Sequence, residues 1–257
     1  MNSFLLRCAI ACLFLNPFSS IAQFGSGHSG PLGHVRLMGG DVFTNHSILL
    51  GYNSPFGIKS LKDLTLAYNR PVPGGFGIAG LNAFGIRGFL QYRAELAYVL
   101  TVGESLHAGL GLLADFYPSC GQLKSGVIPG SSFYLDYLMP GKFRVNIYFD
   151  NWTGLWASLD YPRGEARFSV ISQFHPREDI GIMASFSIAK ARFPLYSIGI
   201  AIKAGGSHQL MAGIKSGPAG FWFAYRYSRG RLELIISLST GSTFGYEPGS
   251  SFRYHIN

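Results

Sequence analysis

The sequence predicts an all-β protein, a transmembrane antiparallel β-barrel of about fourteen strands with a short N-terminal plug segment. Three observations predict it. Charged residues are only 13% of the chain, about half the roughly 25% of a soluble domain, while aromatic residues make up 15% and glycines number 34. From residue 61 onward, apolar residues alternate with small or polar ones. Clusters of Gly, Pro, Asn and Asp separate the alternating segments, as tight turns require.

The first 22 residues have the features of a secretory signal peptide. Arg7 is followed by an apolar run over residues 9–15, and Ser20-Ile21-Ala22 places small residues before a cleavage site. A lipoprotein signal, with Cys12 as the lipidated residue, is the alternative. Cleavage near Ala22 would leave Cys120 as the single cysteine, which excludes an internal disulfide or a multi-cysteine metal site.

Period-two alternation predicts each strand. Phe143, Val145 and Ile147 share one face of a strand, and Arg144 lies on the other, because successive strand side chains point in opposite directions. We expect Phe133, Leu135, Tyr137, Phe221, Phe223, Ile236 and Leu238 on the same outward wall. The predicted strands are 61–69, 75–83, 90–101, 105–116, 131–139, 142–150, 154–161, 165–174, 179–189, 195–203, 207–215, 219–228, 231–240 and 249–257.

A membrane barrel and a soluble β-sandwich both accept this alternation. A sandwich would expose a polar face rich in charge, whereas the polar face here consists mostly of Gly, Ala, Ser and Thr. Aromatic residues stand near many turns, as in the girdles of membrane barrels. The sequence therefore favours a barrel in the outer membrane of a diderm bacterium. The net charge of +8 comes from scattered cations, without the basic run that nucleic-acid binding needs.

The segment 23–60 does not alternate clearly and is rich in glycine. We expect it to fold inside the barrel as a plug, with Arg36 or Asp41 opposite a charged wall residue; a flexible periplasmic tail is the alternative. The predicted organisation is a signal peptide (1–22), a plug segment (23–60) and a barrel (61–257).

Several stretches resemble the FadL-like superfamily of outer-membrane proteins. Residues 37–43 (Leu-Met-Gly-Gly-Asp-Val-Phe) are similar to that family's Gly-Met-Gly-Gly-Ala-Phe, and residues 54–58 (Ser-Pro-Phe-Gly-Ile) to its Asn-Pro-Ala-Gly-Leu. Residues 93–98 and 103–112 resemble the strand–turn–strand sequence pattern that repeats in that family. The most similar branch is the PorV/PorQ-like proteins of Bacteroidetes, which are associated with type IX secretion. The resemblance implies a fourteen-stranded barrel with an N-terminal plug and a context of protein secretion.

Charged residues on the inner face are expected to form ion pairs that hold neighbouring strands, because buried charges must be paired. The expected lumen charge network consists of Arg93, Glu95, Asp136, Arg144, Asp160, Arg167, Arg226 and Glu233. The histidines lack the spacing of zinc ligands. Gly75, Gly77 and Gly80 have the spacing of a dinucleotide-binding motif, but that motif must be followed by a helix and no helical pattern follows here. We expect no catalytic residue, metal or cofactor.

Most connections between the predicted strands are short, and the loop 117–130 is an exception. Loops longer than about 12 residues are commonly functional. We expect this loop to bind a protein partner through Tyr117, Lys124, Val127 and Ile128, and counting strands from a periplasmic N-terminus places it on the periplasmic side.

Because the loops are short, few loop residues are available to build the external binding site of an importer. The sequence therefore favours a non-enzymatic membrane anchor, scaffold or cargo-shuttle adaptor, which the family resemblance connects with type IX secretion. Its partners would be outer-membrane lipid and proteins of a secretion or envelope complex. A passive transporter of a small hydrophobic solute is the first alternative, and a secreted β-sandwich that binds glycans is the second.

Overall fold

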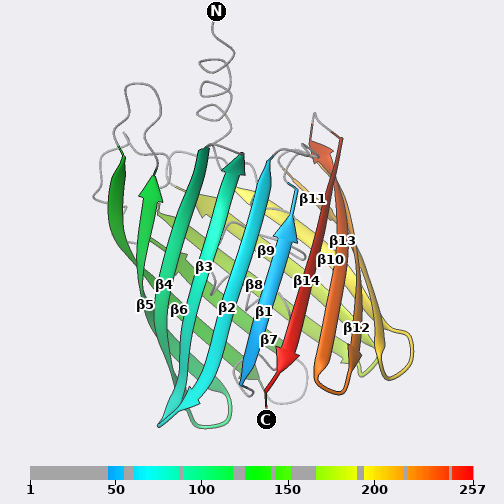
Figure 1. Ribbon diagram of the computed structural model, residues 1–257. Coiled ribbons are helices and arrows are strands. Elements are labelled where there is room, and N and C mark those ends of the chain that lie inside the picture. The colour runs from blue at the N-terminus through cyan, green and yellow to red at the C-terminus, as the bar shows by residue number, and fades with distance from the viewer. Residues whose placement is uncertain are drawn as a thin grey trace, which may run out of the picture.

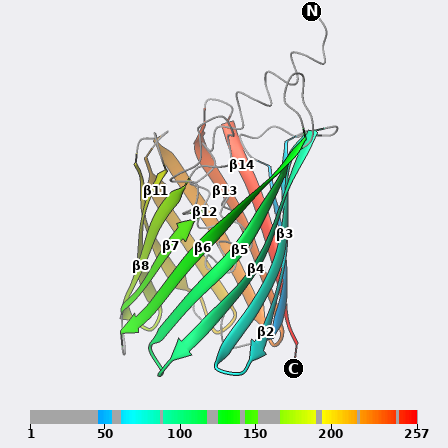
Figure 2. The same ribbon diagram turned by 90° about the vertical axis from the view of Figure 1, so that its left-hand side faces the viewer.

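The chain forms one closed, tilted, antiparallel barrel of fourteen strands in a computed structural model (Figures 1 and 2). The structure describes residues 46–54, 61–86, 89–117, 125–139, 143–151, 166–189, 194–216, 219–242 and 245–256. Each strand pairs with its neighbours in sequence, and β1 pairs with β14 to close the sheet. The predicted fold class is therefore confirmed. The soluble β-sandwich alternative is wrong, because one sheet closes on itself.

No helix among these described ranges is long and apolar enough to cross a membrane.

The strands are seven to fourteen residues long. Their bounds are β1 (Ser47–Asn53), β2 (Lys62–Val72), β3 (Gly75–Ile86), β4 (Phe89–Val102), β5 (Leu106–Tyr117), β6 (Gly126–Met139), β7 (Phe143–Asp150), β8 (Arg167–Arg177), β9 (Ile180–Ala189), β10 (Leu195–Lys203), β11 (His208–Lys215), β12 (Gly220–Arg229), β13 (Leu232–Ser242) and β14 (Gly245–His255).

The two faces of the wall follow the predicted alternation. Arg144 is buried on the inner face, while Val145 and Ile147 belong to the outward face. Exposed apolar side chains cover the outward face, among them Phe221 and Phe223. A one-residue slip would bring Arg144 outward, and a cation near the middle of a bilayer costs about 2–4 kcal/mol. This cost fixes the register of β7.

The first strand corrects the predicted boundary between plug and barrel. β1 lies inside the segment 23–60 that the sequence assigns to the plug, and all seven of its residues pair with both β14 and β2. The adjacent leucines at 49 and 50 and the glycine at 51 hide its alternation. The remaining plug residues 23–45 and the predicted strand 154–161 lie outside the described residues, and β7 pairs directly with β8. Fourteen strands are thus present, but not the predicted fourteen.

The two rims differ in the length of their connections. Both ends of the described chain, Ser47 of β1 and His255 of β14, stand at one rim, which we call the lower rim because it carries the C-terminus in Figure 1. Turns of two to four residues join the strands there, such as 73–74 between β2 and β3. The upper rim carries the longer connections 54–61, 118–125 and 151–166. The extra strand β1 therefore places the connection after β5 at the rim opposite to the start of the first strand, whereas the sequence analysis expected both at one rim.

Exposed aromatic side chains form two belts on the outward face. Tyr68, Tyr98, Tyr137 and Tyr254 stand near the lower rim, and Tyr52, Tyr92, Phe116, Tyr196 and Phe221 near the upper rim. Such belts mark the two interfaces of a bilayer in membrane barrels.

Substitution by arginine on the outward face should cost stability in proportion to depth. We expect Ile200→Arg, in the middle of β10, to lower the free energy of unfolding from liposomes by about 2–4 kcal/mol. Leu232→Arg, at the lower rim, should cost only about 0–1 kcal/mol. Urea-induced unfolding measured by tryptophan fluorescence tests this, and equal costs at both positions would contradict the assigned faces.

Candidate functional site

The inner face of the barrel consists of three layers. Charged residues lie in an upper polar layer, near the starts of β2, β4, β8 and β14 and the ends of β5, β7 and β11. A lower polar layer lies near the turns of the lower rim. A central apolar layer separates them and is buried throughout; it comprises Leu49, Ala67, Ile78, Ala97, Val99, Tyr134, Tyr148, Met183, Ala201, Met211, Trp222, Ala224 and Ile235. The lumen is therefore polar at both ends and apolar in the middle.

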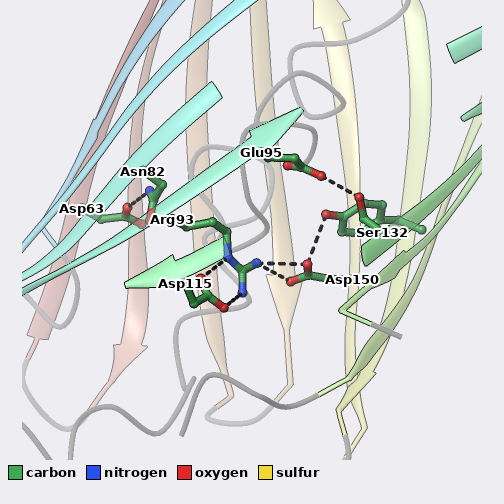
Figure 3. Close-up of polar contacts among 8 residues, drawn as sticks. Asp63, Asn82, Arg93, Glu95, Asp115, Ser132 and Asp150 are labelled. Carbon is green, nitrogen blue, oxygen red and sulfur yellow. Dashed lines mark hydrogen bonds and ion pairs between the residues drawn. The ribbon is translucent and has the colours of Figure 1, made fainter. Parts of the chain in front are cut away.

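Arg93 organises the upper polar layer (Figure 3). Its guanidinium donates from Nε and Nη2 to both carboxylate oxygens of Asp115, at 2.7 and 2.8 Å, and from Nη1 to both oxygens of Asp150, at 3.0 and 2.9 Å. The Tyr148 hydroxyl also donates to Asp150 at 3.3 Å. Arg93 is 5% exposed and Asp115 1%. One cation thus ties β4 to β5 through a bidentate contact, the strongest geometry for such pairs, and to β7 through Nη1.

Two further contacts of the upper layer join carboxylates to neutral donors. Ser132 donates to Glu95 across β5 at 2.6 Å, and Asn82 donates to Asp63 at 2.6 Å (Figure 3). Gly111 of β5 lies between the first two residues. A Cβ at Gly111 would stand 2.4 Å from the Ser132 hydroxyl and 3.0 Å from a Glu95 oxygen, so the contact needs glycine there.

The far wall of the upper layer has its own buried pair. Lys215 Nζ on β11 lies 3.6 Å from a Glu247 oxygen on β14. Ser239 on β13 connects the two, since it accepts from Lys215 at 3.0 Å and donates to Glu247 at 2.9 Å.

The lower polar layer holds two ion-pair clusters. Arg144 donates from Nε to Asp136 at 2.8 Å, and the Asn146 amide also donates to Asp136. On the opposite part of the wall, Glu233 lies between Arg226, at 2.8 Å, and Arg253, at 3.6 Å. The first cluster joins β6 to β7, and the second joins β12, β13 and β14.

The predicted lumen residues occupy the inner wall but do not form one network. Arg93 and Glu95 belong to the upper layer, and Asp136 with Arg144 forms a separate lower pair. Arg226 and Glu233 form another, and Arg167 is buried at the start of β8. Asp160 lies outside the described residues.

The expected charge network omits four acids of the upper layer, namely Asp63, Asp115, Asp150 and Glu247. Asp115 follows Gly109, Gly111 and Leu113 on the inner side of the same alternation, so its position could have been found. Its pairing with Arg93 required the strand register, in which the two residues are direct cross-strand partners.

The predicted partner-binding loop is shorter than expected. β6 begins at Gly126, so Val127 and Ile128 belong to a strand, and Tyr117 ends β5. Val127 is 58% exposed on the outward face, whereas Ile128 pairs with Asp115 on the inner face. Lys124 lies outside the described residues. Val127 and Ile128 therefore belong to the barrel wall and not to a loop, and a protein partner at this connection stays a prediction.

Trp222 is the largest aromatic group of the central apolar layer. A Cβ at Gly213 or Gly199 would lie 2.5 or 2.2 Å from its indole ring, so the ring covers two glycines of β11 and β10. The absence of side chains at both positions lets the indole lie against the wall.

Within the described part of the chain, no group of three or more His, Cys, Asp or Glu could hold a metal ion. The site is a layered lumen in which ion pairs hold most of the charged side chains and neutral donors hold Asp63 and Glu95.

The sequence matches no protein-family model and no curated protein. Similar folds occur among solved structures. Two mutants of the monoaromatic hydrocarbon channel TodX are similar: the deltaS2S3 form has a TM-score of 0.65 and 12% identity over 93% of this chain and 98% of that chain. The deltaS2 form has a TM-score of 0.60 and 12% identity over 95% and 99%. The outer membrane protein Omp33 of Acinetobacter baumannii has a TM-score of 0.50 and 8% identity over 83% and 99%. The chain therefore has the fold of outer-membrane β-barrels.

Removing Arg93 should destabilise the barrel strongly. Arg93→Met leaves Asp115 and Asp150 buried without their shared cation, and such a loss costs about 3–5 kcal/mol. The matched control is Arg177→Met, which breaks the exposed Arg177–Asp179 pair at 3.2 Å and should cost about 0–1 kcal/mol. Unfolding from liposomes in urea measures both. Adding Asp115→Asn and Asp150→Asn to Arg93→Met should restore part of the loss, and equal costs for the two arginines would refute the assignment.

Proposed function

We propose that this chain is a non-enzymatic, passive channel for a small hydrophobic solute in the outer membrane of a diderm bacterium. The observation that supports this most is the central apolar layer. Its thirteen buried side chains come from eleven of the fourteen strands and separate two polar layers. An apolar girdle excludes water and ions but lowers the free energy of an apolar solute.

Two observations support this proposal. The fold is similar to that of TodX, a monoaromatic hydrocarbon channel, and the sequence of residues 37–43 and 54–58 resembles the FadL-like superfamily. In bacterial barrels the short turns face the periplasm and the longer loops face outward. We therefore orient the lower rim toward the periplasm. The signal peptide proposed for residues 1–22 would deliver the chain to that compartment.

The paired charges of the two polar layers suit such a path. Asp115 and Asp150 already hold the Arg93 guanidinium from two sides, so it offers little charge to a passing ion. The central layer is closed in this conformation, because its side chains are buried. Passage of a solute therefore requires local widening of the layer. We propose that residues 23–45 act as a plug, with Arg36 or Asp41 held by the charged wall.

A closed barrel that serves as an anchor or cargo adaptor in protein secretion is the second candidate. The burial of the inner face favours it, since a scaffold needs no open path. This candidate includes the PorV/PorQ-like branch of Bacteroidetes and a protein partner at the connection 118–125. The two candidates differ in one measurable property, which is the flux of a hydrophobic solute.

Flux should depend on the volume of the central apolar layer. We expect Ala201→Phe, a change at a buried inner position, to lower uptake of radiolabelled toluene toward the empty-vector background. Ala212→Phe on neighbouring β11 faces outward and should leave uptake unchanged. Uptake is measured in diderm host cells that lack their own hydrocarbon channels. Both variants must first show heat-modifiable gel migration, which demonstrates a folded barrel.

Uptake by the unmodified protein that equals the vector background would refute the channel and favour the adaptor. Equal uptake by the two folded variants would refute the central layer as the path.

A further inference from the structure

A groove crosses the outward face of the barrel from β2 over β3, β4 and β5 to β6. Its floor consists of the small residues Gly77 and Ala79, and larger side chains rise on both sides. In register, Gly77 lies between Arg70 of β2 and Tyr98 of β4, and Ala79 lies between Tyr68 and Leu96. The groove has a volume of about 670 Å³. Strands β2, β3 and β4 lie side by side in Figure 1.

The walls of this groove are held in place. The Tyr98 hydroxyl donates to the Pro73 carbonyl at 2.9 Å, and the Tyr68 hydroxyl lies 2.7 Å from His46 Nε2. A Cβ at Gly77 would meet only Val72 Cγ1, at 3.7 Å, so the space above Gly77 is open. The groove is therefore a preformed feature of the wall.

The dimensions and lining of the groove suit one acyl chain. The groove crosses five neighbouring strands, from Arg70 of β2 to Ser131 of β6. Neighbouring strands lie about 4.8 Å apart, so the four intervals span about 19 Å, which is more than half of a hydrocarbon core of about 30 Å. Leu96, Leu110 and Leu112 are each at least 66% exposed and give the groove an apolar wall. The groove is therefore long enough for one acyl chain of one leaflet.

Arg70 supplies a cation at the lower end of the groove. It is an exposed residue of β2, lies on the outward face with Tyr68, and lines the groove. Its cross-strand neighbour Gly77 has no side chain to cover it. A guanidinium near a bilayer interface attracts anionic headgroups and binds phosphate with two parallel hydrogen bonds.

We propose that this groove is a binding site for one anionic phospholipid of the leaflet at the lower rim. One acyl chain lies over Gly77 and Ala79 and continues toward Leu110 and Leu112, and the headgroup phosphate accepts hydrogen bonds from Arg70. The inference rests on the membrane location that the proposed function assumes, but not on transport of any solute.

Titration with phosphatidylglycerol and phosphatidylcholine, followed by native mass spectrometry of the delipidated full chain, tests this site. We expect one high-affinity phosphatidylglycerol and a weaker phosphatidylcholine. Arg70→Gln should weaken phosphatidylglycerol binding about fivefold and abolish the preference, because an interfacial arginine contributes about that factor. Gly77→Leu should weaken both lipids, since it fills the groove.

The matched controls are Arg229→Gln, an exposed arginine at the same rim, and Ala212→Leu, on the outward face of β11. Both should bind as the unmodified protein does. Equal losses for Arg70→Gln and Arg229→Gln would show only a general annulus of lipid and would overturn the proposal. Unchanged binding by folded Gly77→Leu would overturn it as well. Toluene uptake should stay normal in both groove variants, so failure of this site is distinguishable from failure of the channel.

Discussion

Closure of the sheet between β1 and β14 is the constraint on which the rest of the structure depends. Backbone N–H and C=O groups have no water to bind inside a bilayer, so a sheet that spans one must have no free edge. β1 is only seven residues long, yet each of its residues pairs on both sides. Closure divides the side chains into an inner and an outward set, and every later feature follows from that division.

The inner set must satisfy a second constraint, the burial of its charges. Paired clusters near both rims meet this constraint, and the wall is apolar between them. Small residues make the contacts possible, since Gly111 leaves room for the Glu95–Ser132 hydrogen bond and Gly199 and Gly213 for Trp222. The outward set uses small residues differently, because Gly77 and Ala79 open a groove toward lipid.

Much of the fold could be predicted from the sequence because period-two alternation reports directly on the two faces of a strand. Arg144 and Ile147 were assigned to opposite faces by that signal alone. β1 was not predicted, because Leu49 and Leu50 are adjacent in a glycine-rich stretch. Without this strand, the connection after β5 was assigned to the wrong rim relative to the start of the first strand. Ion-pair partners could not be predicted, since Arg93 and Asp150 are 57 residues apart and meet only in the closed barrel. Val127 and Ile128 resembled loop residues because β6 extends further than its clear alternation.

The central claim is that the lumen binds small hydrophobic solutes at its apolar layer. Trp222 lies in that layer, so its fluorescence can report on a bound solute. With Trp152 and Trp156 replaced by phenylalanine, bromobenzene should quench Trp222 fluorescence saturably in lipid nanodiscs. A control in which Trp222→Phe and Phe223→Trp are added moves the indole to the outward face, where quenching should rise linearly as the solute partitions into lipid. Saturable quenching confined to Trp222 is the predicted result. Linear quenching of equal strength at both positions, or none at Trp222, would contradict the account.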